Sequence, residues 1–193
     1  MIKNGVNYFT EELHLTVPEV ELYDEATNTF FVAKEQSVRL KHSLLSVSKW
    51  EAKYKKQFLD GIHKRTFAED LDYIRFMTIT QNVDPSFYSR LTNAQIKMVN
   101  DYIVETMSGT TIREDNRMGG PHKPVSAEEI YYWMTEYNIP PEYAKWHLSK
   151  LLMLIRVCGI KKAAQNPKNK KGKGGQNYRS MNNARRKKHH SRG

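Results

Sequence analysis

The chain has 193 residues and a formal net charge of +10, from 31 lysines and arginines against 21 aspartates and glutamates. Residues 161–193 hold twelve of the basic residues and no acidic residue, so residues 1–160 carry a formal charge of −2 and are not a basic domain of the nucleic-acid-binding kind. The single cysteine, Cys158, excludes an intramolecular disulfide.

The first residues, MIKNGVNYFTEEL, contain no apolar stretch of the kind found in secretory signal peptides. The longest apolar run, at residues 151–155, is too short to span a bilayer. We therefore expect an intracellular, soluble protein that makes no membrane contact.

Residues 13–43 have patterns typical of β-strands. Leu13, Leu15 and Val17 alternate with polar residues, and Pro18 indicates an edge or a break. Further strand patterns follow at 20–22, 29–32 and 37–42, with a turn at 25–28. These patterns predict a small antiparallel sheet of three or four strands.

The apolar period changes from two to about 3.6 residues near Leu44, which predicts helices. Capping boxes, in which Ser or Thr is followed three residues later by Glu or Gln, predict helix starts at Ser48, Thr66, Thr92 and Ser126. Asp84 and Pro85 predict another start. The last helix is expected from about Pro140 to Val157, with Gly159 as its C-terminal cap.

The fold class is therefore predicted to be α+β, with about five or six helices after the sheet. We expect an N-terminal β-rich segment at 1–43, a helical domain at 44–160 and a disordered basic tail at 161–193. The tail contains one aromatic residue, Tyr178, and cannot offset the entropy of ordering itself. Residues 107–125 lack periodicity and predict a long loop.

No sequence motif for catalysis or for a cofactor is present. The chain lacks the glycine patterns of nucleotide-binding loops and the nucleophile elbow, and one cysteine with scattered histidines does not make a zinc site. Glu69, Asp70 and Asp72 are expected to favour the helix dipole rather than to act as catalytic acids. His147 is expected to be a satisfied or exposed side chain and Cys158 an inert core residue. We expect no enzymatic activity, cofactor or metal.

The tail is the strongest local signal for binding, because lysines and arginines neutralise phosphates without reading base sequence. Tyr178 is the single aromatic residue among these charges, so the tail lacks the interleaved aromatic residues that stack on successive bases. A solvated tail, weak polyanion contact and folding on a protein partner remain alternatives. The residues expected to contact polyanions are Lys168, Lys170, Lys171, Lys173, Arg179, Arg185, Arg186, Lys187 and Lys188.

Four blocks carry a resemblance to a known family: SVRLKHSLLSVSKWEAKYKKQFL, DYIRFMTITQNVDPSFYSRLT, EEIYYWMTEYNIPPEYAKWHLSKLLMLIRVCGIK and SMNNARRKK. Over roughly residues 37–188, the chain resembles tail assembly chaperones of long-tailed bacteriophages. The resemblance implies a non-enzymatic protein of the host cytoplasm that binds the tape-measure protein, helps recruit tail-tube subunits and is absent from the mature virion. It implies no catalytic or ligand residues and leaves the oligomeric state open.

A chaperone of this kind needs apolar surface for its client. Tyr131, Tyr132, Trp133 and Met134 are the residues predicted to supply it, with at least one of the two tyrosines pointing outward. Core packing is the alternative for Trp133 and Met134. The rival functions are nucleic-acid binding through the basic arm and a structural role in the virion tail.

Overall fold

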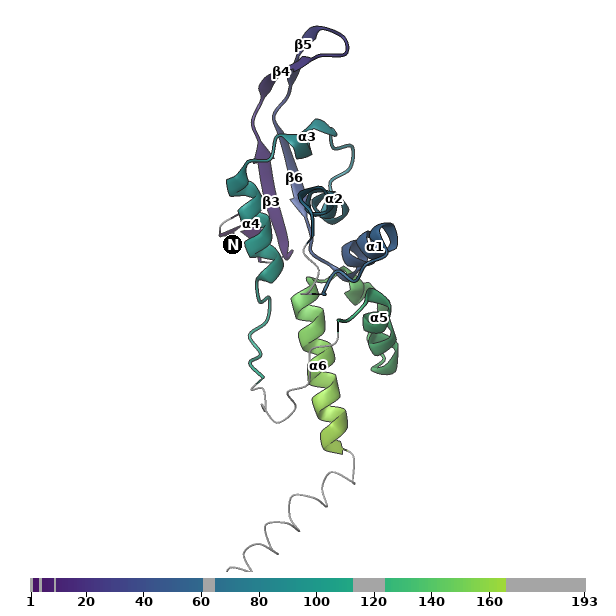
Figure 1. Ribbon diagram of the computed structural model, residues 1–193. Coiled ribbons are helices and arrows are strands. Elements are labelled where there is room, and N and C mark those ends of the chain that lie inside the picture. The colour runs from purple at the N-terminus through teal and green to yellow at the C-terminus, as the bar shows by residue number, and fades with distance from the viewer. Residues whose placement is uncertain (1, 4, 9, 61–64, 113–123, 166–193) are drawn as a thin grey trace, which may run out of the picture. The chain divides into compact units, whose positions relative to one another are not determined.

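The computed structural model describes residues 2–3, 5–8, 10–60, 65–112 and 124–165 (Figure 1). It contains a small antiparallel sheet followed by helices, which confirms the predicted α+β class and the change of period near Leu44. The chain divides into a unit of residues 1–153 and a second unit that begins at residue 154. All elements except the C-terminal part of the last helix belong to the first unit.

The main sheet has the strand order β1-β2-β3-β6 and is antiparallel throughout. Its longest pair is β3 (Glu12–Val17) with β6 (Gln36–Leu40), and the short strands β2 (Val6–Asn7) and β1 (Ile2–Lys3) extend the sheet on the other side of β3. These two short strands precede residue 13 and were not predicted. Leu13, Leu15 and Val17 are buried, as their alternation predicted.

A second, two-stranded sheet pairs β4 (Val20–Asp24) with β5 (Thr29–Ala33). The register of this pair continues that of β3 with β6, since Val17 pairs with Gln36 and Val20 pairs with Ala33. The four strands therefore form one long hairpin with its turn at residues 25–28. Pro18, which has no N–H to donate, interrupts the hairpin after β3. In Figure 1 the β4–β5 part projects beyond the main sheet.

Three of the four predicted capping boxes are confirmed. Thr66, Thr92 and Ser126 each accept a hydrogen bond from the backbone N–H three residues on, and that residue's side chain accepts from the cap's own N–H. The helices that they begin are α2 (Phe67–Met77), α4 (Asn93–Val104) and α5 (Ala127–Glu136). The predicted start at Asp84 and Pro85 corresponds to the short helix α3 (Ser86–Ser89), where Asp84 Oδ1 accepts from the N–H of Ser86 at 2.8 Å.

The predicted helix start at Ser48 is wrong. Helix α1 (Leu44–Tyr54) is capped by Ser43, whose side chain exchanges hydrogen bonds with Ser46 in a box of the Ser-x-x-Ser type. Ser48 therefore lies inside the helix. The carboxylate of Glu51, expected to close the box, instead accepts hydrogen bonds from two N–H groups elsewhere in the chain.

The prediction of one helix from Pro140 to Val157 is also wrong. Residues Pro141–Lys145 form a 3₁₀-helix, and Trp146 is extended, because His147 forms an isolated antiparallel bridge with Ser43. Helix α6 (Leu148–Gln165) begins after this break. Gly159, expected to end the helix, lies within it, and residues 161–165 continue it where a disordered tail was predicted.

An aromatic cluster fills the core between α1 and α2. The rings of Trp50 and Phe58 lie 5.3 Å apart, and those of Phe58 and Tyr73 lie 4.0 Å apart, centre to centre. The indole Nε1 of Trp50 donates to the carbonyl oxygen of Glu69 at 3.1 Å. This bond satisfies the one polar atom of the buried indole and ties the two helices together.

A second buried cluster is polar and joins the sheet to the start of α6. The ring of His42 lies 2.5 Å, Nδ1 to Oη, from Tyr73 and 5.1 Å, centre to centre, from the ring of His147. His147 Nε2 donates to the carbonyl oxygen of Tyr102 at 3.2 Å, and its Nδ1 accepts from the N–H of Ser149. His147 is thus a buried, hydrogen-bonded histidine, as the sequence analysis allowed.

Candidate protein-binding surface

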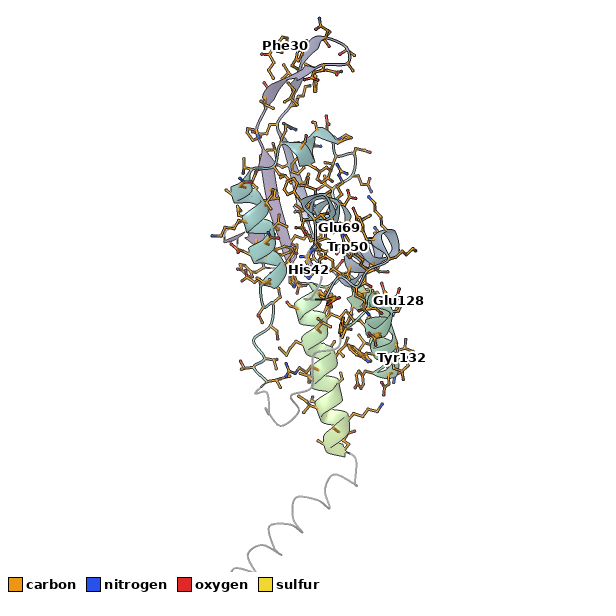
Figure 2. All side chains as sticks on the ribbon, viewed as in Figure 1. Phe30, His42, Trp50, Glu69, Glu128 and Tyr132 are labelled. Atoms are coloured by element: carbon orange, nitrogen blue, oxygen red, sulfur yellow. The ribbon has the colours of Figure 1, made fainter. Side chains whose placement is uncertain are left out.

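The projecting hairpin, residues 20–33, exposes more large apolar side chains than any other element among the described residues. Its exposed side chains, between 39 and 69% accessible, are Val20, Tyr23, Phe30, Phe31 and Val32. Figure 2 shows Phe30 on this hairpin, away from the core positions of His42 and Trp50. Scattered exposed apolar residues are ordinary, whereas a contiguous group indicates an interaction surface.

Both faces of the hairpin are apolar. Residues paired across antiparallel strands share a face, so Tyr23 and Phe30 lie on one face and Leu22 and Phe31 on the other. The rings of Tyr23 and Phe30 are 4.9 Å apart, centre to centre. A hairpin that packed one face on its own core would alternate apolar and polar residues, and this one does not.

The turn of the hairpin is held by hydrogen bonds. Asp24 accepts from the N–H of Ala26 at 2.9 Å and from the hydroxyl of Thr27 at 2.8 Å. These hydrogen bonds lower the pKa of Asp24, and the bond from the Thr27 hydroxyl has the largest effect. Asn28 has a φ of 54°, a left-handed conformation that asparagine tolerates, and its Oδ1 accepts from the hydroxyl of Tyr23.

Arg90, at the end of α3, holds the joint between the hairpin and the main sheet. Its guanidinium donates to the carbonyl oxygens of Pro18 at 2.9 Å, Lys34 at 3.3 Å and Ala33 at 3.4 Å. These acceptors lie on both strands at the point where the ladder is interrupted. The hairpin is therefore anchored at its base although its faces are open.

The hairpin region is acidic. Residues 18–35 contain five carboxylates, at Glu19, Glu21, Asp24, Glu25 and Glu35, against the single basic residue Lys34, a formal charge of −4. The remainder of residues 1–160 then carries a formal charge of +2. The negative excess of the folded part is thus concentrated on the apolar hairpin.

The four residues predicted on α5 are only partly available to a partner. Tyr132 is 64% exposed, as Figure 2 shows, whereas Tyr131 and Trp133 are half-buried. Met134 is 3% exposed, since it follows Ile130 by one helical turn and shares its buried face. Met134 therefore packs in the core, which was the alternative given for it, and Tyr132 is the fully exposed residue of this group.

The basic tail residues predicted to contact polyanions, from Lys168 to Lys188, lie outside the described residues. Most of the predicted loop at 107–125 also lies outside them. Sequence reasoning missed the hairpin as a binding surface, although one signal was present. Phe30, Phe31 and Val32 are consecutive, and consecutive side chains of a strand point to opposite faces. If one face of the hairpin were buried, the other would still expose an apolar side chain.

The carboxylates of α2 have structural partners. Glu69 completes the capping box with Thr66 and pairs with Lys56 at 2.6 Å. The hydrogen bond from Lys56, and after it that from the Thr66 N–H, lowers the pKa of this carboxyl. Asp72 pairs with Lys53 and Arg75, and the Lys53 hydrogen bond lowers its pKa. These contacts give the acidic group a role in joining α1 to α2.

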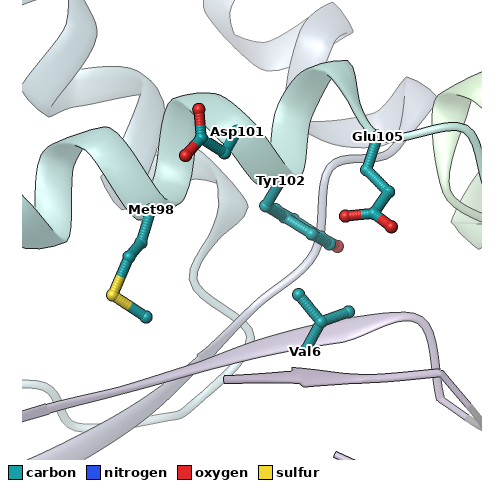
Figure 3. A pocket seen from close by; sticks show the side chains of 5 residues that line it. All are labelled: Val6, Met98, Asp101, Tyr102 and Glu105. Atoms are coloured by element: carbon teal, nitrogen blue, oxygen red, sulfur yellow. The ribbon is translucent and has the colours of Figure 1, made fainter. Parts of the chain in front are cut away.

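Figure 3 shows a pocket of about 240 Å³ between β2 and α4, lined by Val6, Met98, Asp101, Tyr102 and Glu105. One of its two carboxylates, Glu105, accepts from the hydroxyl of Tyr8 at 2.9 Å. No three His, Cys, Asp or Glu side chains within the described ranges gather closely enough to hold a metal ion. The pocket therefore presents two acids and an apolar floor without a recognisable reactive group.

Comparison with protein-family models, with curated proteins and with solved structures finds no match to this chain. In the part of the chain that the structure describes, no helix combines the length and the apolar character that crossing a bilayer requires. The exposed hairpin is the feature on which a function can be argued.

Proposed function

We propose that the chain is a non-enzymatic tail assembly chaperone of a long-tailed bacteriophage, which binds the tape-measure protein and helps recruit tail-tube subunits during tail morphogenesis. The observation that carries this proposal is the anchored hairpin at residues 20–33, with apolar side chains on both faces. A protein that holds a client without changing it needs such an accessible surface. The resemblance over residues 37–188 supports the identity of the client.

The size of the surface suits a reversible complex. Covering a large apolar side chain contributes about 1.5–3 kcal/mol, and association itself costs several kcal/mol in lost freedom of motion. A handful of such side chains therefore supports binding that a growing assembly can displace. A chaperone of this kind acts in the host cytoplasm and leaves before the virion is complete.

Co-expression with the tape-measure and tail-tube proteins of the same phage, followed by pull-down, tests the proposal. The wild type should retain the tape-measure protein, and a Phe30→Ser, Phe31→Ser double variant should lose it. Phe67→Ser is the matched control, since Phe67 is 63% exposed on α2 and lies outside the hairpin. Absence of either client from the wild-type complex, or equal capture by the double variant, would overturn the proposal.

Nucleic-acid binding is the second candidate function, and the twelve basic residues at 161–193 favour it. A third candidate, a structural component of the tail, has a direct test in purified particles. If the chain were present at stoichiometric levels in mature virions, the chaperone proposal would give way to the structural one.

A further inference from the structure

We propose that the outer edge of β5 binds an extended, positively charged segment of another protein, which adds to the β4–β5 hairpin as a third strand. The inference rests on the proposed function in one respect, namely that the segment belongs to the client. It goes beyond that function in naming the edge that binds and the chemistry of the segment.

The edge argument starts from the pairing. Strands β4 and β5 form a sheet of two strands, so within the described residues each has one edge without a strand partner. Such an edge presents a row of backbone N–H and C=O groups, and a two-stranded hairpin alone is marginal in water. Addition of a strand from a partner is a common mode of peptide recognition.

The edge of β5 is the less protected of the two. Natural edge strands are usually blunted by charged side chains, proline or a bulge. β4 carries Glu21 and Asp24, whereas β5, with the sequence TFFVA, has no charged residue and no proline. Phe30 and Phe31 lie on opposite faces, so a third strand beside β5 would find an aromatic neighbour for its side chains on both faces.

The charge of the hairpin region decides the chemistry of the occupant. A formal charge of −4 over residues 18–35 repels nucleic acid and anionic membrane surfaces and favours a segment with lysines or arginines. It also disfavours a second copy, because pairing two hairpins would bring these charges together. The chain's own residues 166–193 match the charge but offer Tyr178 as their single aromatic residue, so they do not match the apolar faces.

A binding measurement with synthetic peptides and the full chain tests the inference. The probe is a fluorescent peptide of alternating lysine and valine, which has the strand propensity and the charge required. One control peptide has proline at alternate valine positions and the same charge, and another has glutamate in place of lysine. We expect the lysine–valine peptide to bind about tenfold or more tightly than either control at physiological salt.

Variants of the chain locate the site. Phe30→Ser with Phe31→Ser, and separately Glu21→Lys with Glu25→Lys, should each weaken the lysine–valine peptide about tenfold, while Phe67→Ser should leave its affinity unchanged. Circular dichroism checks that each variant is folded, which the exposure of all these side chains favours.

Four results would overturn the inference. Equal binding of the proline peptide would show that charge acts without strand pairing, and equal binding of the glutamate peptide would remove the charge argument. Self-association of the full chain that the double Phe variant abolishes would identify a second copy as the occupant. If the peptides fail but hairpin-dependent capture of the tape-measure protein persists, the proposed function stands and the edge mechanism falls.

Discussion

The guanidinium of Arg90 donates a 2.9 Å hydrogen bond to the carbonyl oxygen of Pro18, which lies 72 residues earlier in the chain. Pro18 lies where the long hairpin is interrupted, and Arg90 also reaches the carbonyl oxygen of Lys34 on the opposite strand. The α3 region therefore fixes the direction in which residues 20–33 project.

The first prediction concerns this joint. Arg90→Ala should lower the free energy of unfolding by about 1–3 kcal/mol, because carbonyl groups lose hydrogen bonds from a charged donor. In this variant, hydrogen exchange with solvent should be accelerated more at the backbone amides of β4 and β5 than at those of β3 and β6. Hydrogen exchange followed by mass spectrometry measures both effects. Lys97→Ala removes one exposed positive charge from α4 and is the control; an equal effect there would refute the role of the joint.

The second prediction compares two phenylalanines. Phe30→Ala should change the free energy of unfolding by less than about 1 kcal/mol, because the side chain is exposed and loses mainly its contact with Tyr23. Phe87→Ala should cost about 3–5 kcal/mol, since that ring, which α3 carries, is fully buried. Urea unfolding of both variants measures the difference. A large loss for Phe30→Ala would place that residue in a core and contradict the binding surface.

The third prediction concerns Glu51, a buried carboxylate on α1. Its Oε1 accepts from the N–H of Phe58 at 2.7 Å and its Oε2 accepts from the N–H of Ala127, the first residue of α5, at 2.8 Å. Glu51→Ala leaves two donors without an acceptor and should cost about 2–4 kcal/mol. Glu51→Gln keeps one acceptor oxygen and should cost about half as much in the same unfolding assay. Glu128→Gln, in the exposed first turn of α5, should have no comparable effect.

Local signals in the sequence account for most of the helix boundaries that were predicted correctly. The hydrogen bonds of a capping box such as that of Thr66 with Glu69 join residues within four positions of each other. The local sequence is therefore sufficient to predict it. Ser48 had the same spacing to Glu51, yet Ser43 caps α1, because the end of β6 and the bridge to His147 fix the chain there. That constraint is non-local and left no trace in the pattern.

Apart from the consecutive apolar residues of β5, the binding surface was hard to predict for a related reason. Strand patterns at 20–22 and 29–32 predicted the two strands of the hairpin, but whether other elements cover a hairpin depends on contacts between distant residues. The carbonyl acceptors of Arg90 illustrate this, since nothing near residue 90 in the sequence indicates a contact with Pro18 or Lys34. The consecutive tyrosine and tryptophan residues of α5 were easily recognised in the sequence. Which of them are exposed depends on which face of the helix packs against the core.

The fourth prediction is that the folded state loses stability between about pH 7 and pH 5. Burial, and then the charge of nearby His147, lowers the pKa of His42 from 6.5 to about 3, and burial also lowers the pKa of His147. In this window the unfolded chain binds protons at both histidines, whereas the folded chain binds none at His42 and fewer than the unfolded chain at His147. The free energy of unfolding therefore falls as pH falls, by up to about 1.4 kcal/mol per pH unit for each histidine.

Urea titrations at several pH values check this dependence. His42→Asn should lower the overall stability and flatten the slope, because one of the two titrating groups is gone. A slope above pH 5 that is the same in wild type and His42→Asn would show that His42 is not the titrating group. The pKa of paired carboxyls such as Asp72 is lowered, so these act at lower pH.

The last prediction concerns residues 166–193, which hold ten basic residues and no acidic one. Truncation after Gln165 should leave the melting temperature unchanged, because the helix residues just before the cut, 161–165, are exposed and the removed segment has little apolar surface to bury. The full chain should bind DNA and RNA weakly and without sequence preference. This binding should fall steeply between low and physiological salt, since each phosphate contact releases a counterion.

Fluorescence anisotropy with several labelled duplexes and single strands, over a salt series, measures the affinity, and the truncated chain should show none of it. A variant with Lys170, Lys171, Arg185 and Arg186 changed to glutamine keeps the length and should bind with a shallower salt dependence, because four contacts are lost. With Tyr178 as the single aromatic residue, the segment has no means of stacking on a run of bases. If the full chain instead bound one sequence tightly at physiological salt, and the truncated chain did not, nucleic-acid recognition would replace the chaperone proposal, since the acidic hairpin has no part in such binding.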